Sequence, residues 1–272
     1  MSALRSDSTL RGGGLKCRRM SNEIPAYYSG LASFRTLFGQ GNPVVIYHKL
    51  GPRPGGVRLK GLYLSEALFA RQLEELREAG FTSGSLLECA TKPAGKRVVI
   101  TFDDGYANAL RHGLGPLACT HFKAIQFLAA DLLGKRNEWD VPLGETPERM
   151  MDQTQVREWL AAGHEIGSHT LTHPYLTRLP PARAREEITS SRKKLQDTFV
   201  RPIDHFCYPY GDWNEAVRDM VMEAGYRTAC TTMAGVNTAA DSPFALKRFT
   251  ARYPSRKLKV VWGQVRAWMD PV

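Results

Sequence analysis

Residues 98–106, VVITFDDGY, join a strand-like run to two neighbouring acids. The first five residues are β-branched or aromatic and fit a short strand that is buried on both faces. Asp103 and Asp104 follow directly, and Gly105 permits a sharp turn. Adjacent carboxylates repel each other unless a cation or a proton lies between them, so one can bind a metal while the other exchanges protons. Because Asp-Asp-Gly is also a common turn, this stretch by itself leaves a simple polar loop open.

A second stretch, residues 164–173 (HEIGSHTLTH), places His169 and His173 four residues apart. On a helix or a helix-like turn, this spacing puts both imidazoles on one face. Two histidines and a carboxylate form a three-ligand site with one position left open, which is the pattern of catalytic zinc. An isolated histidine pair is more often structural or exposed. Here the pair lies between the acidic strand end and a turn at residues 208–211 (YPYG).

Taken together, these stretches resemble the polysaccharide deacetylase family, whose members contain a NodB-homology domain and include carbohydrate esterases. Residues 101–105 (TFDDG) are similar to the first family motif, and residues 169–173 (HTLTH) to the second. Residues 206–211 partly match the third motif, an aromatic-Pro-Tyr-Gly turn. The order and spacing also agree, and the resemblance covers roughly residues 43–250. It implies an α/β fold with a single domain, the distorted (β/α)7 barrel of these enzymes.

The resemblance also implies a function and a set of site residues. The chain would remove N-acetyl groups from an N-acetylhexosamine-containing polysaccharide or a lipid-linked sugar, releasing acetate. Asp104, His169 and His173 would hold a divalent metal ion, most often Zn²⁺, although Co²⁺, Ni²⁺ and Mn²⁺ suit the same ligands. Asp103 would act as the general base, and the backbone N–H of Tyr210 would stabilise the oxyanion.

Two positions depart from the family pattern. Many members carry an Arg at the start of the third motif, where this chain has Cys207, and a His in a final Leu-x-His motif, where residues 246–248 read LKR. Our hypothesis is that Arg248 supports Asp103 and that His48 serves as the acid, because both follow predicted strands and face the same barrel mouth. A structural His48 bonded to the backbone is an equally good interpretation.

Hydrophobic patterning predicts seven strands alternating with helices, which favours a parallel sheet. Periodicity alone fits an open doubly wound sheet as well, and the barrel is what the family resemblance implies. The strands are expected near residues 44, 98, 124, 165, 205, 227 and 246, the last one spanning 244–249. The helices are expected at 65–79, 106–119, 152–162, 181–199, 212–224 and 256–269. The fifth of them begins with the acids at 212 and 215. The candidate residues mostly fall at carboxyl ends of strands, where parallel α/β folds carry their chemistry.

Composition sets the remaining expectations. The chain has 272 residues and a net charge of +10, but no dense basic run or nucleic-acid motif, so no nucleic-acid partner is predicted. The five cysteines include no Cys-x-x-Cys pair, which favours reduced thiols. No run is apolar and long enough for a membrane span, and the absence of a signal peptide predicts a cytoplasmic location, although the family often acts at the cell envelope. We expect a flexible basic tail and docking segment at 1–40 and the catalytic domain at 41–272, and no oligomeric state is predicted.

Alternatives to the deacetylase remain at this stage. One is a metal amidase acting on a non-sugar amide or cyclic imide. Another is a catalytically impaired carbohydrate-binding protein, because the family Arg and His are missing. Some aromatic side chains are candidates either for stacking on a sugar or for ordinary packing: Trp139, Tyr175 and Trp213. Four histidines without a partner motif are expected to be structural or at the surface: His112, His121, His164 and His205.

Overall fold

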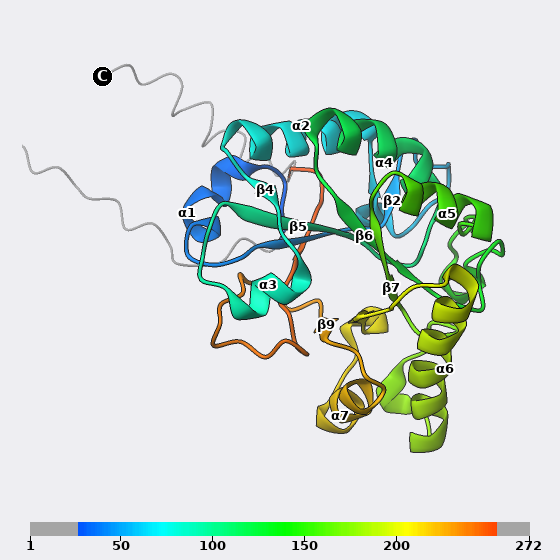
Figure 1. Ribbon diagram of the computed structural model, residues 1–272. Helices are drawn as coiled ribbons and strands as arrows, with labels where there is room; N and C mark the ends of the chain where they lie inside the picture. Colours follow the sequence, from blue (N-terminus) through cyan, green and yellow to red (C-terminus); the bar gives the residue numbers. More distant parts are fainter. Residues whose placement is uncertain (1–26, 255–272) are drawn as a thin grey trace, which may run out of the picture.

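The computed structural model describes residues 27–254, which form an α/β domain around a curved parallel sheet (Figure 1). The strand order is β10-β1-β5-β6-β7-β8-β9, and every pair is parallel. The strands are β1 (Val44–Tyr47), β5 (Arg97–Phe102), β6 (Ala124–Leu128), β7 (Glu165–Ser168), β8 (His205–Cys207), β9 (Thr228–Cys230) and β10 (Phe249–Thr250). In addition β4 (Thr82–Ser83) pairs with β5, and β2 (Lys49–Leu50) pairs with β3 (Tyr63–Leu64).

The two edge strands β9 and β10 are linked by one segment of chain. Leu246 forms a parallel bridge to Cys230, with its carbonyl accepting from Thr231 N–H at 2.9 Å. Three residues later Phe249 pairs with Val45 of β1. The sheet therefore curls into a distorted barrel, which confirms the predicted fold class. The prediction of a last strand over 244–249 was wrong in extent, because this segment bonds first to one edge and then to the other.

Helices surround the sheet on the outside (Figure 1). They are α1 (Arg35–Phe38), α2 (Glu66–Glu78), α3 (Leu86–Thr91), α4 (Ala107–Thr120), α5 (Gln153–Ala161), α6 (Pro181–Phe199) and α7 (Glu215–Glu223). Short 3₁₀ turns occur at η1 (Leu31–Ser33), η2 (Lys60–Leu62), η3 (Glu138–Leu143), η4 (Leu176–Arg178) and η5 (Pro209–Gly211). The predicted helices within the described part of the chain are confirmed, whereas α1 and α3 were not predicted.

Polar caps explain where the helices begin. The Ser65 hydroxyl accepts from Leu68 N–H at the start of α2, as its position before an apolar helical pattern predicts. Asp152 and Gln155 exchange hydrogen bonds in a capping box at the start of α5. The predicted start of α7 at the acid 212 was wrong, because the helix begins at Glu215 and its cap is Asn214, which accepts from Val217 N–H at 2.9 Å.

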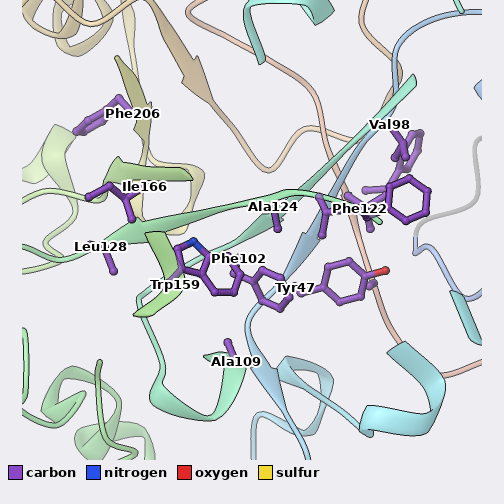
Figure 2. Close-up of a cluster of buried hydrophobic side chains, with 14 of the residues drawn as sticks. Tyr47, Val98, Phe102, Ala109, Phe122, Ala124, Leu128, Trp159, Ile166 and Phe206 are labelled. Atoms are coloured by element: carbon purple, nitrogen blue, oxygen red, sulfur yellow. The ribbon is translucent and has the colours of Figure 1, made fainter. Parts of the chain in front are cut away.

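The apolar core between sheet and helices fixes the direction of the central strand. The Phe102 ring lies 5.4 Å from Tyr47 and 5.8 Å from Trp159, between the sheet and α5 (Figure 2). All three side chains are buried, and burying such a ring contributes roughly 1.5–3 kcal/mol. Because Phe102 immediately precedes Asp103, this packing determines where the two acids leave the strand.

The segment before the sheet docks onto its edge. Tyr28, Phe34 and Phe38 form an aromatic cluster in which the Phe34 ring lies 5.0 Å from that of Phe249. Residues 1–26 and the helix expected at 256–269 lie outside the described residues, and the domain boundary at residue 40 stays a prediction. Within the described part of the chain, no helix combines the length and apolarity that crossing a bilayer requires. The cysteines there are unpaired: Cys89, Cys119, Cys207 and Cys230.

The buried imidazole of His164 predicts acid sensitivity of the fold. Its Nδ1 accepts from Ala124 N–H at 3.3 Å, and burial lowers its pKa from 6.5 to about 4. The unfolded chain then binds the proton more tightly than the folded chain does. The free energy of unfolding should therefore fall by on the order of 2 kcal/mol as the pH drops from about 6.5 to about 4, and it should stay level above pH 6.5. Urea denaturation at several pH values measures this slope. His164→Gln should flatten it only in part, because burial also lowers the pKa of His205, to about 4, and the pKa of His48. The exposed His121, changed to Asn, is the control, and an unchanged slope in His164→Gln would contradict the assignment.

Candidate active site

One cavity of about 620 Å³ opens at the carboxyl edge of the sheet. The predicted site residues in its lining follow four different strands, β1, β5, β7 and β8. Of the site residues predicted from the sequence, all but one line it: His48, Asp103, Asp104, His169, His173 and Tyr210. The exception, Arg248, is buried behind Asp103. The strand-end argument therefore correctly predicted a shared location, while the chemical roles stay predictions.

Unusual backbone conformations concentrate at this cavity. Among the described residues, six non-glycine residues have positive φ, and four of them belong to the site: Asp104, Thr170, His173 and Tyr210, with φ between 60° and 73°. Such conformations cost on the order of 1–3 kcal/mol each and persist only when the surroundings hold them. The helix-like turn expected for the histidine pair is thus wrong in detail, since residues 169–173 form an irregular turn.

A buried carboxylate on α6 holds this turn in place. Glu187 accepts from the backbone N–H groups of Leu171 and Thr172 at 2.9 and 3.0 Å, and from the Thr172 hydroxyl at 2.7 Å. The Thr170 hydroxyl also accepts from His173 N–H at 3.0 Å. Sequence reasoning missed Glu187, although a Glu next to Ile188 on the apolar face of a predicted helix was a usable signal.

Asp104, His169 and His173 converge on one point. Asp104 Oδ1 lies 3.3 Å from His169 Nε2 and 3.2 Å from His173 Nε2, and all three side chains are buried. Burial alone would raise the pKa of Asp104, but its bonds to the two imidazoles hold the pKa well below the ordinary value. His169 Nδ1 contacts the carbonyl of Cys207 at 2.7 Å, which orients Nε2 toward the carboxylate as in metal-binding histidines. This donor set fits a divalent metal ion.

A second group of metal-binding residue types, Asp103, His169 and Cys207, also lies close together. In this second group, Asp103 already forms an ion pair with Arg248, and His169 also belongs to the group of Asp104 and His173. Burial raises the pKa of the Cys207 thiol to about 11, so it is protonated at neutral pH. The first group is therefore the better metal site.

Arg248 makes a two-pronged ion pair with Asp103. Nη1 donates to Oδ1 and Nη2 to Oδ2, both at 2.8 Å. Nε donates to the Thr231 carbonyl at 2.9 Å, and Nη1 also reaches the Thr101 hydroxyl at 3.0 Å. Burial would raise the pKa of Asp103, but the charge and hydrogen bonds of Arg248 hold it below the ordinary value. Nη2 lies 3.0 Å from the sulfur of Cys207, the residue at the family Arg position.

His48 lines the same cavity as Asp103 and Asp104. Burial lowers its pKa, while the charges of the two aspartates act in the opposite direction. A lowered pKa makes the protonated ring a stronger acid, but it also leaves most of the imidazole neutral at pH 7.

Two charged residues at the site were not predicted. Asp140 lines the cavity and accepts from Asn137 at 2.9 Å, and its burial raises its pKa. Lys49 is fully buried, with Nζ 4.5 Å from the ring centre of Tyr106 and 4.9 Å from that of Tyr63. Asp140 lies in the short 3₁₀ turn η3, whose sequence gives no periodic pattern, whereas a Lys directly after an apolar strand was a detectable signal for Lys49.

The aromatic candidates separate into two groups. Tyr175 and Tyr210 stack at 3.9 Å between ring centres, and Trp139 stacks on His173 at 4.4 Å; all line the cavity. Trp213 instead packs near Tyr208 and is not part of the cavity lining.

The motifs and this geometry agree with a comparison to known families. The family model described as Polysaccharide deacetylase matches residues 90–229, just over half of the chain. The chain belongs to the polysaccharide deacetylase family. This confirms the resemblance seen in the sequence and the predicted enzyme class, a hydrolase of the polysaccharide deacetylase type.

Individual relatives are distant. The Bacillus subtilis (strain 168) protein YxkH, which its name places among the polysaccharide deacetylases, is 24% identical over 76% of this chain and 70% of its own. A peptidoglycan-N-acetylglucosamine deacetylase from Bacillus cereus is 34% identical, over 27% of this chain and 34% of its own. The Streptococcus pyogenes deacetylase PplD, solved with acetate, has the same fold, with a TM-score of 0.68 and 21% identity over 84% of this chain and 98% of its own.

The ligand set gives a direct metal-binding prediction. Asp104→Ala or His173→Ala should weaken Co²⁺ or Zn²⁺ affinity at least about tenfold, because each removes a donor from a three-residue site. Cys207→Ser is the matched control and should keep both the affinity and the visible spectrum of the Co²⁺ protein. An intense sulfur-to-cobalt absorption band, lost in Cys207→Ser, would instead assign the metal to the group containing Cys207.

Proposed function

We propose that this chain is a metal-dependent deacetylase that hydrolyses the N-acetyl group of an aminosugar. The observation that carries the proposal is the different pairing of two adjacent buried acids. Asp103 is held by a guanidinium, whereas Asp104 faces two imidazoles. The same residue type is thus prepared for two tasks, proton transfer and metal binding.

Asp104, His169 and His173 would hold the divalent ion, for which Zn²⁺ is the first choice and Co²⁺, Ni²⁺ and Mn²⁺ are alternatives. When bound, the ion supplies Lewis acidity, which activates water and polarises the acetyl carbonyl. Glu187 and the contact of His169 with the Cys207 carbonyl keep the ligands in place.

Asp103 takes the proton of the attacking water in this proposal. Arg248 keeps the carboxylate ionised and fixes its plane, so Asp103 remains a base at pH values where a free buried acid would be protonated. The ion pair also makes Asp103 a weaker base, and the positioning of the attacking water next to the carboxylate offsets this loss.

Tyr210 and His48 would complete the reaction. The backbone N–H of Tyr210, set in a left-handed conformation, is proposed to donate to the oxyanion as it forms on the acetyl carbon. His48 is proposed to protonate the leaving amine, so that acetate and a free amino sugar result. Both assignments rest on position in the cavity and on the family resemblance.

The proposed substrate is an N-acetylated glycan. The rings of Trp139, Tyr175 and Tyr210 line the cavity and suit stacking on a sugar face. A deacetylase of the family with N-acetylglucosamine in its name, the Bacillus cereus relative, supports the choice. The intact pairing of Arg248 with Asp103 weighs against a binding protein that has lost catalysis, because Arg248 stands in for the missing family Arg.

Acetate release tests the reaction itself. Metal-reconstituted protein should release acetate from N-acetylglucosamine oligomers, and Asp103→Asn should reduce kcat by at least about 10²-fold, since it removes the base while keeping the shape. Enzymatic determination of acetate is the measurement, with Cys119→Ser as a surface control. Release from a non-sugar acetamide but not from the oligomers would favour the amidase alternative.

The pH profile tests the pairing of Arg248. Because this guanidinium lowers the pKa of Asp103, Arg248→Gln should shift the acid limb of kcat/KM to higher pH, and Arg248→Lys should shift it less. His48→Ala should lower kcat without moving that limb. Full activity in both His48→Ala and Arg248→Ala would reject the two assignments together.

A further inference from the structure

A second cavity, of about 960 Å³, adjoins the catalytic one. The two share lining from Lys60, Gly61 and Arg252. A third cavity, of about 650 Å³, lies along the loop of residues 53–60, and its lining also includes Lys60. A group in the second cavity would therefore lie next to a sugar in the catalytic cavity.

Positive charge dominates the linings of these hollows outside the catalytic centre. Four cationic side chains contribute to them: Arg53, Arg58, Lys60 and Arg252. The acid in the lining of the second cavity, Glu66, is engaged by His112 at 2.7 Å. Such a local excess of one sign attracts and concentrates groups of the opposite sign.

Arg252 is held in place at the junction. A Cβ on Gly61 would lie 2.8 Å from its guanidinium carbon, so only glycine leaves room for this position. The guanidinium carbon lies 3.8 Å from the centre of the Tyr27 ring, and Nε is buried without a hydrogen-bond partner among the described residues. Because Arg252 also lines both cavities, its guanidinium is placed to receive an anionic oxygen there.

The loop that carries the other cations is also anchored. Leu59 N–H donates to Glu145, and Val57 is buried. Arg58 packs closely on Gly144, where an added Cβ would lie 3.0 Å from its Cδ. The positive residues thus stand on a fixed loop beside the catalytic cavity.

We propose that the second cavity binds a phosphate or diphosphate group carried by the N-acetylated sugar. The substrate class is then a phosphate-linked aminosugar rather than a neutral glycan, which rests on the proposed deacetylase function. Guanidinium groups match phosphate oxygens in pairs, and several cations suit a group with more than one negative charge better than a single carboxylate. The volume accommodates a diphosphate together with part of the group beyond it.

The test compares three soluble substrates by acetate release. They are N-acetylglucosamine linked through a diphosphate to uridine, the same sugar linked through a diphosphate to a citronellyl chain, and the neutral methyl glycoside. At least one diphosphate compound should exceed the neutral one by about tenfold in kcat/KM, and added salt should reduce this preference. The better of the two identifies a nucleotide or a lipid carrier as the source of the phosphate.

Variants test which residues cause the preference for diphosphate substrates over the neutral one. Lys60→Gln and Arg252→Gln should each lower the ratio of kcat/KM between diphosphate and neutral substrates, and Gly61→Ala should do so by displacing Arg252. The control is Lys193→Gln on α6, an exposed lysine paired with Asp197, which should leave the ratio unchanged. A ratio near one in the wild type, or a ratio unchanged by Lys60→Gln and Arg252→Gln, would overturn the proposal.

A binding measurement tests the phosphate site independently of the proposed deacetylase reaction. If none of the substrates releases acetate, the deacetylase function fails, and calorimetry with N-acetylglucosamine 1-phosphate decides on the cavity. Binding about tenfold tighter to the wild type than to Lys60→Gln supports the phosphate site. Equal binding to both proteins overturns it.

Discussion

Two carboxylates on neighbouring residues are buried side by side at the end of β5, and the site depends on how their repulsion is relieved. In a medium of low polarity, each charge needs a partner of its own. The backbone turns between them, since Asp104 takes a left-handed conformation, and the two side chains diverge. Arg248 neutralises one, while His169 and His173 surround the other. Removing one partner would leave a buried charge unpaired, at a cost of about 3–5 kcal/mol.

The closure of the barrel and the chemistry of the site are linked through the segment between β9 and β10. Leu246 bonds to β9 and Phe249 to β1, so residues 247 and 248 form the passage between the two edges of the sheet. Arg248 occupies that passage and reaches Asp103, which is 145 residues earlier in the chain. The same few residues therefore close the sheet and hold the proposed base.

Much of this arrangement could be predicted from the sequence, because the strands are apolar runs that stop at polar residues. Phe102 followed by Asp103 located both a buried strand and its functional end. The irregular turn of His169 to His173 could not be predicted, because it depends on Glu187, which follows Leu171 by 16 residues, as well as on the local bond from His173 N–H to the Thr170 hydroxyl. Likewise Asp140 and the cationic loop lack periodicity. Asp140 bonds to Asn137 within its own turn, whereas the loop is held through Leu59 by Glu145, which is 86 residues later in the chain.

The exchange of Cys207 for the usual Arg follows from the space around Asp103. The Cys207 sulfur lies 3.0 Å from Nη2 of Arg248 and 3.5 Å from Oδ2 of Asp103. A second guanidinium at this position would have to share the same carboxylate and the same buried volume with the first. Two cations so close in a poorly solvated environment repel strongly. The Arg that pairs with Asp103 can thus come either from position 207 on β8 or from position 248 on the closing segment. When it comes from position 248, as here, position 207 requires a small neutral residue.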